Sequence, residues 1–343
     1  MSEALLDLAA EQAAKVPTFA VHPNPKVGCV IRSKDAKIFS GAHVFFGGPH
    51  AEINAIAAAK NAGADLKGAE VFVSLEPCSH FGKTPPCVQA LIEAKVSKVV
   101  IGTLDPFQGR TGMGVQALQA AQIECETVEH QKSFELNRHW IFAQKFQRPF
   151  VSLKIATTAD GFFARNDGES KYITGSAARA KVHQLRAESQ GILSSRPSIE
   201  RDDARLDVRS ENFKGTQPQV YVWSSKMSFS HEQLEILQKP LRVSFLDSSI
   251  SWDTHLSTLF KKGVHHLLIE AGPTLSSEFL RKKRVQELHH FIAPKYFGAG
   301  LSFSRVFEFS NLDGLAHKSV NSNVLEDGNI WICTKFYDFK DLT

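Results

Sequence analysis

One histidine, two cysteines and one carboxylate lie close together near the start of the chain, and they constrain its fold more than any other feature. His50 and Glu52 are two residues apart, and Cys78 and Cys87 follow with eight residues between them. Imidazole and thiolate are ligands that zinc prefers, and three of them leave a fourth position open. Residues two apart do not share a face of a regular helix. His50 and Glu52 can therefore converge only in the first turn of the helix expected over residues 50–60.

This pattern predicts a catalytic zinc site with its own proton carrier. Zinc held by His50, Cys78 and Cys87 would lower the pKa of a bound water to about 7. Glu52 would then take a proton from that water and return it to a leaving amine. His-x-Glu followed by Pro-Cys is typical of zinc deaminases. Two other interpretations stay open: His80 closes a purely structural site as a fourth ligand, or the cysteines are unrelated core residues.

The length and the alternation of apolar segments with helical patterns predict an α/β protein of two domains. The chain has 343 residues, whereas a single core seldom grows beyond about 250–300. Arg148-Pro149 marks the boundary, giving domains at residues 1–147 and 148–343. In the first domain we expect strands at residues 27–31, 36–43, 69–75, 96–102 and 122–126, and helices at residues 3–15, 50–60, 87–94, 115–121 and 130–142, arranged as a sandwich with a mixed sheet.

The second domain repeats the alternation. We expect strands at residues 150–156, 191–193, 219–223, 241–246, 265–270, 287–293 and 330–336, and helices at residues 176–188, 255–262 and 276–283. Gly272 follows an expected strand and precedes an expected helix. Such a turn can hold an anionic cofactor group on its amides, and an ordinary strand-to-helix turn is the alternative.

Composition narrows the possible partners and the compartment. The net charge of +4 is small, and residues 281–284 form the one basic run, so we expect no nucleic-acid partner. No apolar segment of about 18 residues predicts a membrane span, and the first residues do not resemble a secretory signal. Five cysteines are few for this length, which indicates a reducing compartment, with the cytoplasm as the default.

Three motifs surround the expected metal site: His22 to Gly28, Pro49 to Glu52, and Leu75 to Cys87 with its Thr-Pro-Pro-Cys ending. Together they resemble the N-terminal domain of the bifunctional riboflavin biosynthesis deaminase–reductase family. The resemblance implies a cytidine-deaminase-like fold that deaminates a ribosylated, phosphorylated diaminopyrimidinone. By motif position it implies substrate contacts at Asn24, His43, Lys83 and Thr84. Their chemistry agrees, because lysine suits a phosphate and asparagine can both donate to and accept from a ring edge.

Motifs after residue 150 resemble the C-terminal domain of the same family, which is similar to dihydrofolate reductase and uses NADPH. They are Leu153-Lys154 with Asp160-Gly161, Gly168 to Ser170, Leu185 to Ala187, Asp202 to Arg209, and Glu270 to Thr274. The resemblance implies reduction of the ribosyl group to ribityl. It implies substrate contacts at Ser170, Arg186, Leu206, Arg209 and Glu270, and cofactor contacts at Ala156, Tyr172, Ser198 and Asp202, to which the turn at Gly272 is added.

Several positions depart from the family pattern and keep alternatives open. After Asp105-Pro106 the family's asparagine is replaced, and Arg110 is expected to supply a charge there. Phe162, Tyr172 and the segment Asp202 to Asp207 differ from the usual cofactor motifs. The alternatives are therefore a deaminase with a degenerate, non-reducing second domain, or a deaminase of nucleic acid or free base. The non-enzymatic alternative is a zinc-stabilised module with a binding C-terminal domain. We expect a homo-oligomer that acts on a pyrimidine ribotide.

Overall fold

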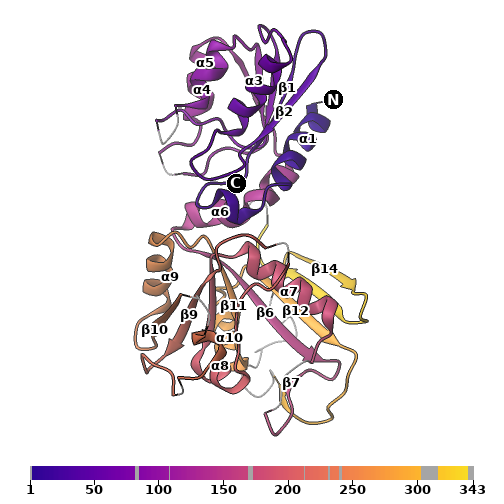
Figure 1. The fold of residues 1–343 in the computed structure, drawn as a ribbon, viewed down its shortest axis with the longest axis vertical. Helices are drawn as coiled ribbons and strands as arrows, with labels where there is room; N and C mark the ends of the chain where they lie inside the picture. The colour runs from indigo at the N-terminus through magenta and orange to yellow at the C-terminus, as the bar shows by residue number, and fades with distance from the viewer. Residues whose placement is uncertain are drawn as a thin grey trace. The chain divides into compact units, whose positions relative to one another are not determined.

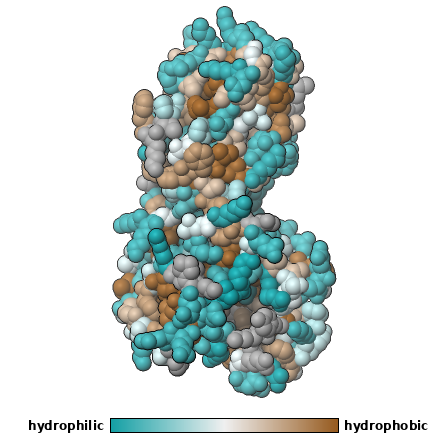
Figure 2. Space-filling model, in the orientation of Figure 1, coloured by the Kyte–Doolittle hydropathy of each residue, from teal (hydrophilic) through white to brown (hydrophobic). Residues whose placement is uncertain are grey.

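The computed structural model describes residues 2–81, 85–107, 109–168, 173–211, 213–230, 232–238, 242–302 and 316–338. The chain divides into two compact units, Met1–Phe146 and Gln147–Asp338, which are coloured indigo to magenta and magenta to yellow in Figure 1. No described helix is long and apolar enough to cross a membrane. On the face drawn in Figure 2, each unit has hydrophilic residues over its surface with smaller hydrophobic areas scattered among them, which is ordinary for a globular protein.

The first unit is built on a five-stranded mixed sheet. Its strands, in spatial order, are β2 (Ile38–Ala42), β1 (Gly28–Arg32), β3 (Glu70–Val73), β4 (Lys98–Ile101) and β5 (Glu124–Thr127). β1 is antiparallel to β2 and β3, whereas β3, β4 and β5 are parallel. The helices are α1 (Ser2–Ala14), α2 (Thr18–Val21), α3 (Ala51–Asn61), α4 (Cys87–Glu93), α5 (Met113–Ala120) and α6 (Gln131–Phe146).

Alternating strand residues bury both faces of this sheet. Val30, Phe72 and Val100 pack with Leu6 and Ala9 of α1. The residues between them on the strands point to the other face, where they pack with the apolar side chains of α3, α4 and α5. Successive side chains of a strand point to opposite faces, so a strand covered on both sides is apolar throughout. The predicted α/β sandwich with a mixed sheet is confirmed.

The second unit is built on an eight-stranded sheet. Its strands, in spatial order, are β10 (Val243–Asp247), β9 (Gln219–Ser224), β8 (Gly191–Ser195), β11 (His266–Glu270), β6 (Phe150–Thr158), β12 (Glu287–Ala293), β15 (Ile330–Lys335) and β14 (Ser319–Val324). The first six strands in this order, from β10 through β9, β8, β11 and β6 to β12, are each parallel to their neighbours. β15 is antiparallel to β12, and β14 is antiparallel to β15. A two-stranded sheet pairs β7 (Phe162–Ala164) with β13 (Leu301–Ser302).

Helices cover both faces of the large sheet. α9 (Trp252–Lys261) and α10 (Pro273–Arg281) pack on one face, over Leu153, Leu267 and Ile269. α7 (Ser176–Glu188) and α8 (Arg196–Asp202) pack on the other, over Ile192, Leu268 and their neighbours. A short 3-10 helix, η1, spans Glu235–Leu237. The alternation of strands and helices after residue 150 is thus also confirmed.

α8 was not predicted, and its start shows why. Pro197 lies in the first turn of this helix, where proline is accepted because its missing amide hydrogen has no partner to lose. Ser195 is the N-cap, and its side chain accepts a hydrogen bond from the amide of Ser198. Arg196-Pro197 therefore begins a helix.

Candidate zinc centre and reductase site

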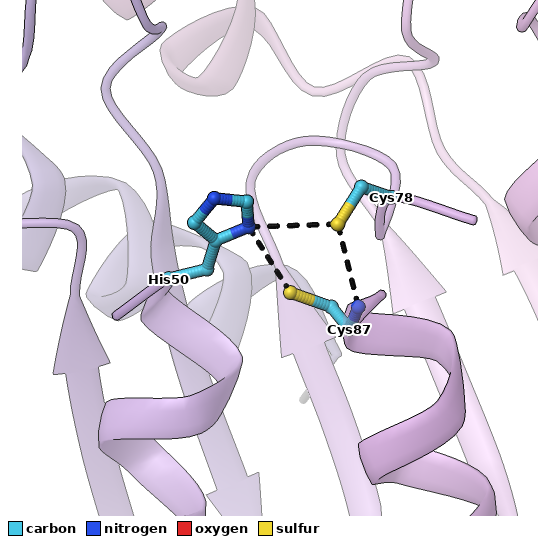
Figure 3. Close-up of side chains that lie close together, drawn as sticks. All are labelled: His50, Cys78 and Cys87. Atoms are coloured by element: carbon cyan, nitrogen blue, oxygen red, sulfur yellow. Dashed lines mark hydrogen bonds between the residues drawn. The ribbon is translucent and has the colours of Figure 1, made fainter. Parts of the chain in front are cut away.

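His50, Cys78 and Cys87 lie together although they come from three segments. His50 is the N-cap of α3, Cys78 lies in the loop after β3, and Cys87 is the first residue of α4. The Nδ1 atom of His50 is 3.2 Å from the Sγ of Cys87 and 3.5 Å from the Sγ of Cys78. Figure 3 shows the three side chains pointing toward one another. All three ligand atoms lie within 4.8 Å of one another.

This donor set fits a zinc ion. Two sulfurs and one imidazole nitrogen are soft and borderline ligands of the kind that zinc prefers. The amide of Cys87 donates to the Sγ of Cys78 at 3.3 Å. Hydrogen bonds from Cys87 and His50 hold the pKa of the Cys78 thiol well below its ordinary value, so this ligand is available as a thiolate. His80 is outside this group, and its Nε2 lies 3.0 Å from Nη1 of Arg110.

Glu52 lies in the first turn of α3 and is only 3% exposed. Burial, and then the negative charge of Cys78, raise the pKa of its carboxyl group to about 7. A carboxyl group whose pKa is near neutral can both take up and release a proton at physiological pH. Its position after His50 therefore supplies an acid–base group beside the three ligands.

His50, Cys78 and Glu52 line one pocket of about 240 Å³. Asn24 and His43, two of the four expected substrate contacts, also line this pocket. The Nδ1 of His43 donates to the carbonyl of Pro49 at 3.0 Å, so its Nε2 can accept from the amide nitrogen of Asn24 at 3.1 Å. Lys83 and Thr84, the other two expected contacts, lie outside the described residues.

Sequence reasoning missed the support that one buried carboxylate gives to this pocket. Glu76 accepts hydrogen bonds from the amides of Asp105, Gly112, Gly114 and Val115, at 2.7–3.3 Å. It thereby fixes the segment that brings Arg110 and Phe107 to the pocket. A buried acid directly after an apolar strand was the available signal. Trp140 of α6 and Phe46, in the turn after β2, also line the pocket, and no local signal marks them.

In the second unit, the structure brings Arg186, Glu270 and Lys154 together. Arg186 of α7 donates to both carboxylate oxygens of Glu270, at 2.5 and 2.9 Å, and to the carbonyl of Asp207 at 2.9 Å. Nζ of Lys154 is 3.8 Å from the same carboxylate. Although burial opposes ionisation, Arg186 and Lys154 hold the pKa of Glu270 at about 2. Glu270 is therefore a buried, fully ionised carboxylate.

Four other expected contacts of this unit are described by the structure with their own partners. Arg209 has a side chain that is 43% exposed, and its Nη1 is 3.4 Å from Asp207. Leu206 packs its side chain into the core beside α7. The hydroxyl of Ser198 accepts a hydrogen bond from the amide of Gly272 at 3.0 Å, which joins two expected cofactor contacts.

The remaining expected contacts are a half-buried pair and two residues that are not described. Ala156 lies on β6 and Asp202 ends α8, and both are half-buried. Ser170 and Tyr172 lie outside the described residues.

Family comparisons match both units. Residues 2–103 match the cytidine and deoxycytidylate deaminase zinc-binding region, and residues 149–329 match the RibD C-terminal domain. A "Riboflavin biosynthesis protein RibD" of Buchnera aphidicola subsp. Baizongia pistaciae is 35% identical over 321 residues, covering 83% of this chain and 85% of its own.

Solved structures agree over the whole length. Acinetobacter baumannii RibD, form 1, has a TM-score of 0.89 at 34% identity and covers 98% of this chain and 99% of its own. A Thermotoga maritima diaminohydroxyphosphoribosylaminopyrimidine deaminase/5-amino-6-(5-phosphoribosylamino)uracil reductase has a TM-score of 0.87 at 31% identity, with 98% and 99% covered.

Proposed function

This chain belongs to the RibD family of bifunctional deaminase–reductases of riboflavin biosynthesis, and from that membership we propose which of its residues carry each step. We assign the zinc-dependent deamination to residues 1–147 and the NADPH-dependent reduction to residues 148–343. The division into units at Phe146 and Gln147 supports this boundary, as do the segments that the two family models match.

In the deaminase domain, His50, Cys78 and Cys87 hold the zinc. Zinc bound there supplies a Lewis acid that makes water a nucleophile at neutral pH. Glu52 accepts the proton of that water and delivers it to the amine that leaves the ring. Asn24 and His43 orient the pyrimidine from the pocket wall, and Lys83 and Thr84 contact its ribose phosphate. One observation supports this proposal: the three ligand atoms lie within 4.8 Å of one another, and His50 and Cys78 line the same pocket as the buried Glu52.

In the reductase domain, Glu270 and Arg209 are the principal substrate contacts. Arg209 is exposed and positively charged, so it suits the ribose phosphate. Arg186 is bound to Glu270 through both of its oxygens, so its share in binding the substrate includes holding that carboxylate ionised and oriented. Ser170 and Leu206 complete the substrate side. The NADPH contacts are Ala156, Tyr172, Ser198, Asp202 and Gly272.

Replacing Glu52 tests the deaminase assignment. Glu52→Gln keeps the size and burial of the side chain but removes the proton carrier, so deamination should fall by about 10²–10⁴-fold. Zinc content should stay at the wild-type level, because Glu52 is not a ligand. Ammonia release and elemental analysis measure the two effects. Glu93→Gln, an exposed carboxylate on α4, is the matched control, and turnover near wild type in Glu52→Gln would refute the mechanism.

We also propose that the protein forms a homo-oligomer and that the subunits pair through β14. All six residues of this edge strand are exposed, and Val320 and Val324 are 48% and 75% exposed beside the exposed Ile330 of β15. An exposed edge strand has unpaired backbone groups and can pair with another chain. Val320→Asp with Val324→Asp should therefore reduce the mass measured by sedimentation to that of a monomer. An unchanged mass, or a monomeric wild type, would contradict the proposal.

We also place the protein in the cytoplasm. All five cysteines are outside disulfides, and two of them are zinc ligands in our assignment, which suits a reducing compartment. Cell fractionation with the deaminase assay as readout tests this, and recovery of the activity from an oxidising compartment would contradict it.

A further inference from the structure

A second group of metal-ligating side chains lies in the reductase unit, away from the proposed substrate contacts. His289 of β12 and Cys333 of β15 are directly opposite each other in an antiparallel pair. Glu287 precedes His289 by two residues, so its side chain points to the same face of the sheet. The pairing of β12 with β15 thus collects one carboxylate, one imidazole and one thiol on three neighbouring positions.

These three side chains are close enough for one ion to reach. Their ligand atoms all lie within 4.8 Å of one another. Glu287, His289 and Cys333 are 1%, 3% and 8% exposed, so the group is enclosed by the fold. A carboxylate, an imidazole and a thiolate together are ligands that zinc accepts.

The ring of His289 gives the strongest indication that this group binds an ion. Neither of its ring nitrogens has a hydrogen-bond partner within the part of the chain that the structure describes. Nε2 faces the Oε2 of Glu287 at 3.4 Å, which is close but is not a good hydrogen bond. A buried polar atom without a partner costs about 1–3 kcal/mol, and a metal ion between these atoms would remove that cost.

The carboxylate of Glu287 is also held by a second hydrogen bond, as metal ligands commonly are. The hydroxyl of Tyr337 donates to the Oε1 of Glu287 at 3.1 Å, and the Oε2 faces Nε2 of His289 at 3.4 Å. Metal-bound carboxylates commonly have such a second hydrogen bond, which fixes their orientation. The ring of Trp331 stacks on His289, with centroids 6.0 Å apart and an angle of 12° between the planes. The imidazole is therefore fixed as well.

We propose that Glu287, His289 and Cys333 bind a second zinc ion, which joins β12 to β15. With the carboxylate and the thiolate both ionised, the two charges of the ion are balanced. The competing arrangement is a metal-free imidazolium–carboxylate pair with a neutral thiol. That pair has the same net charge, but it leaves two N–H donors of a buried ring poorly satisfied.

The test uses the full-length protein with the first site removed. Cys78→Ser with Cys87→Ser eliminates the two sulfur ligands of the deaminase centre, and the protein is then saturated with Zn²⁺ and desalted. The proposal predicts that about one equivalent of zinc per chain remains bound. Co²⁺ in its place should give a near-ultraviolet thiolate-to-cobalt absorption. Folded protein with no retained zinc and no such absorption would overturn the proposal.

Two further variants in that background identify the ligands. His289→Leu should abolish both signals, whereas His290→Leu should keep them. His290 is the matched control because it is next in the same strand, faces the opposite side of the sheet and is bonded to Thr157 at 2.8 Å. If His289→Leu does not fold, the zinc and cobalt measurements on the cysteine variant still decide the question. Equal metal content in the two folded histidine variants would show that the ion binds elsewhere and would also overturn the proposal.

Discussion

At the scale of single residues, Arg186 allows the reductase unit to contain the buried negative charge of Glu270. The pKa of Glu270 is held at about 2 by Arg186 and Lys154 against the opposing effect of burial. A carboxyl group whose pKa is lowered by folding stabilises the native state above its unfolded pKa of about 4.3. That stabilisation is lost as the pH falls from there towards 2.

Removing the arginine should therefore destabilise the protein in a pH-dependent way. In Arg186→Leu, Glu270 keeps only Lys154 nearby, so its pKa should rise and the free energy of unfolding at pH 7 should fall by about 3–5 kcal/mol. The loss should shrink at lower pH, because protonation removes the poorly paired buried charge. Urea unfolding at about pH 7 and pH 5 measures this.

The control for this prediction is Arg179→Leu, an exposed arginine of the same helix. It should change the free energy of unfolding by less than about 0.5 kcal/mol. A loss in Arg186→Leu that is the same at both pH values would contradict the account of Glu270.

At the scale of elements, Gly28 allows α1 to pack closely on the sheet of the first unit. A Cβ atom on this residue would lie 1.9 Å from the carbonyl oxygen of Ala9 and 3.0 Å from the amide nitrogen of Ala13. Both are backbone atoms, so no side-chain rotation relieves the clash. Gly28→Ala should displace α1 and lower the free energy of unfolding by about 1–3 kcal/mol.

Urea unfolding of Gly28→Ala, compared with Ser40→Ala at an exposed position of β2, measures this effect. The control should be close to wild type. Wild-type stability in Gly28→Ala would mean that α1 does not require this close approach.

The sequence predicted most elements because their patterns are local. β1, β3 and β4 each contain three consecutive buried apolar residues, and α3 begins where His50 and Glu52 required a first helical turn. β14 was not predicted because four of its six residues are polar and all six are exposed. It is a strand only because β15 offers it a hydrogen-bonding edge, and that edge is a property of the tertiary fold.

The candidate sites divide in the same way. His50, Cys78 and Cys87 could be proposed together because their residue types and spacing limit the chemistry. The pairing of Arg186 with Glu270 bridges 84 positions, and that of His289 with Cys333 depends on the register of two strands. Neither follows from local pattern, and Glu76 was missed because its partners are backbone amides.

At the scale of the whole molecule, the chain joins two units that each have their own core and their own candidate site. The zinc ligands and Glu52 all come from the first unit, and the Arg186–Glu270 pair comes from the second. We infer that deamination occurs at the first site and that the second site then reduces the deaminated product.

The most direct measurement follows ammonia release and NADPH absorbance together in the Glu52→Gln protein. Given the diaminopyrimidine ribotide, this variant should release almost no ammonia and oxidise almost no NADPH. When the deaminated ribotide is supplied instead, it should oxidise NADPH as fast as wild type, because the second site is intact. NADPH oxidation at the wild-type rate with the diamino substrate, or none by either protein with the deaminated ribotide, would contradict the account.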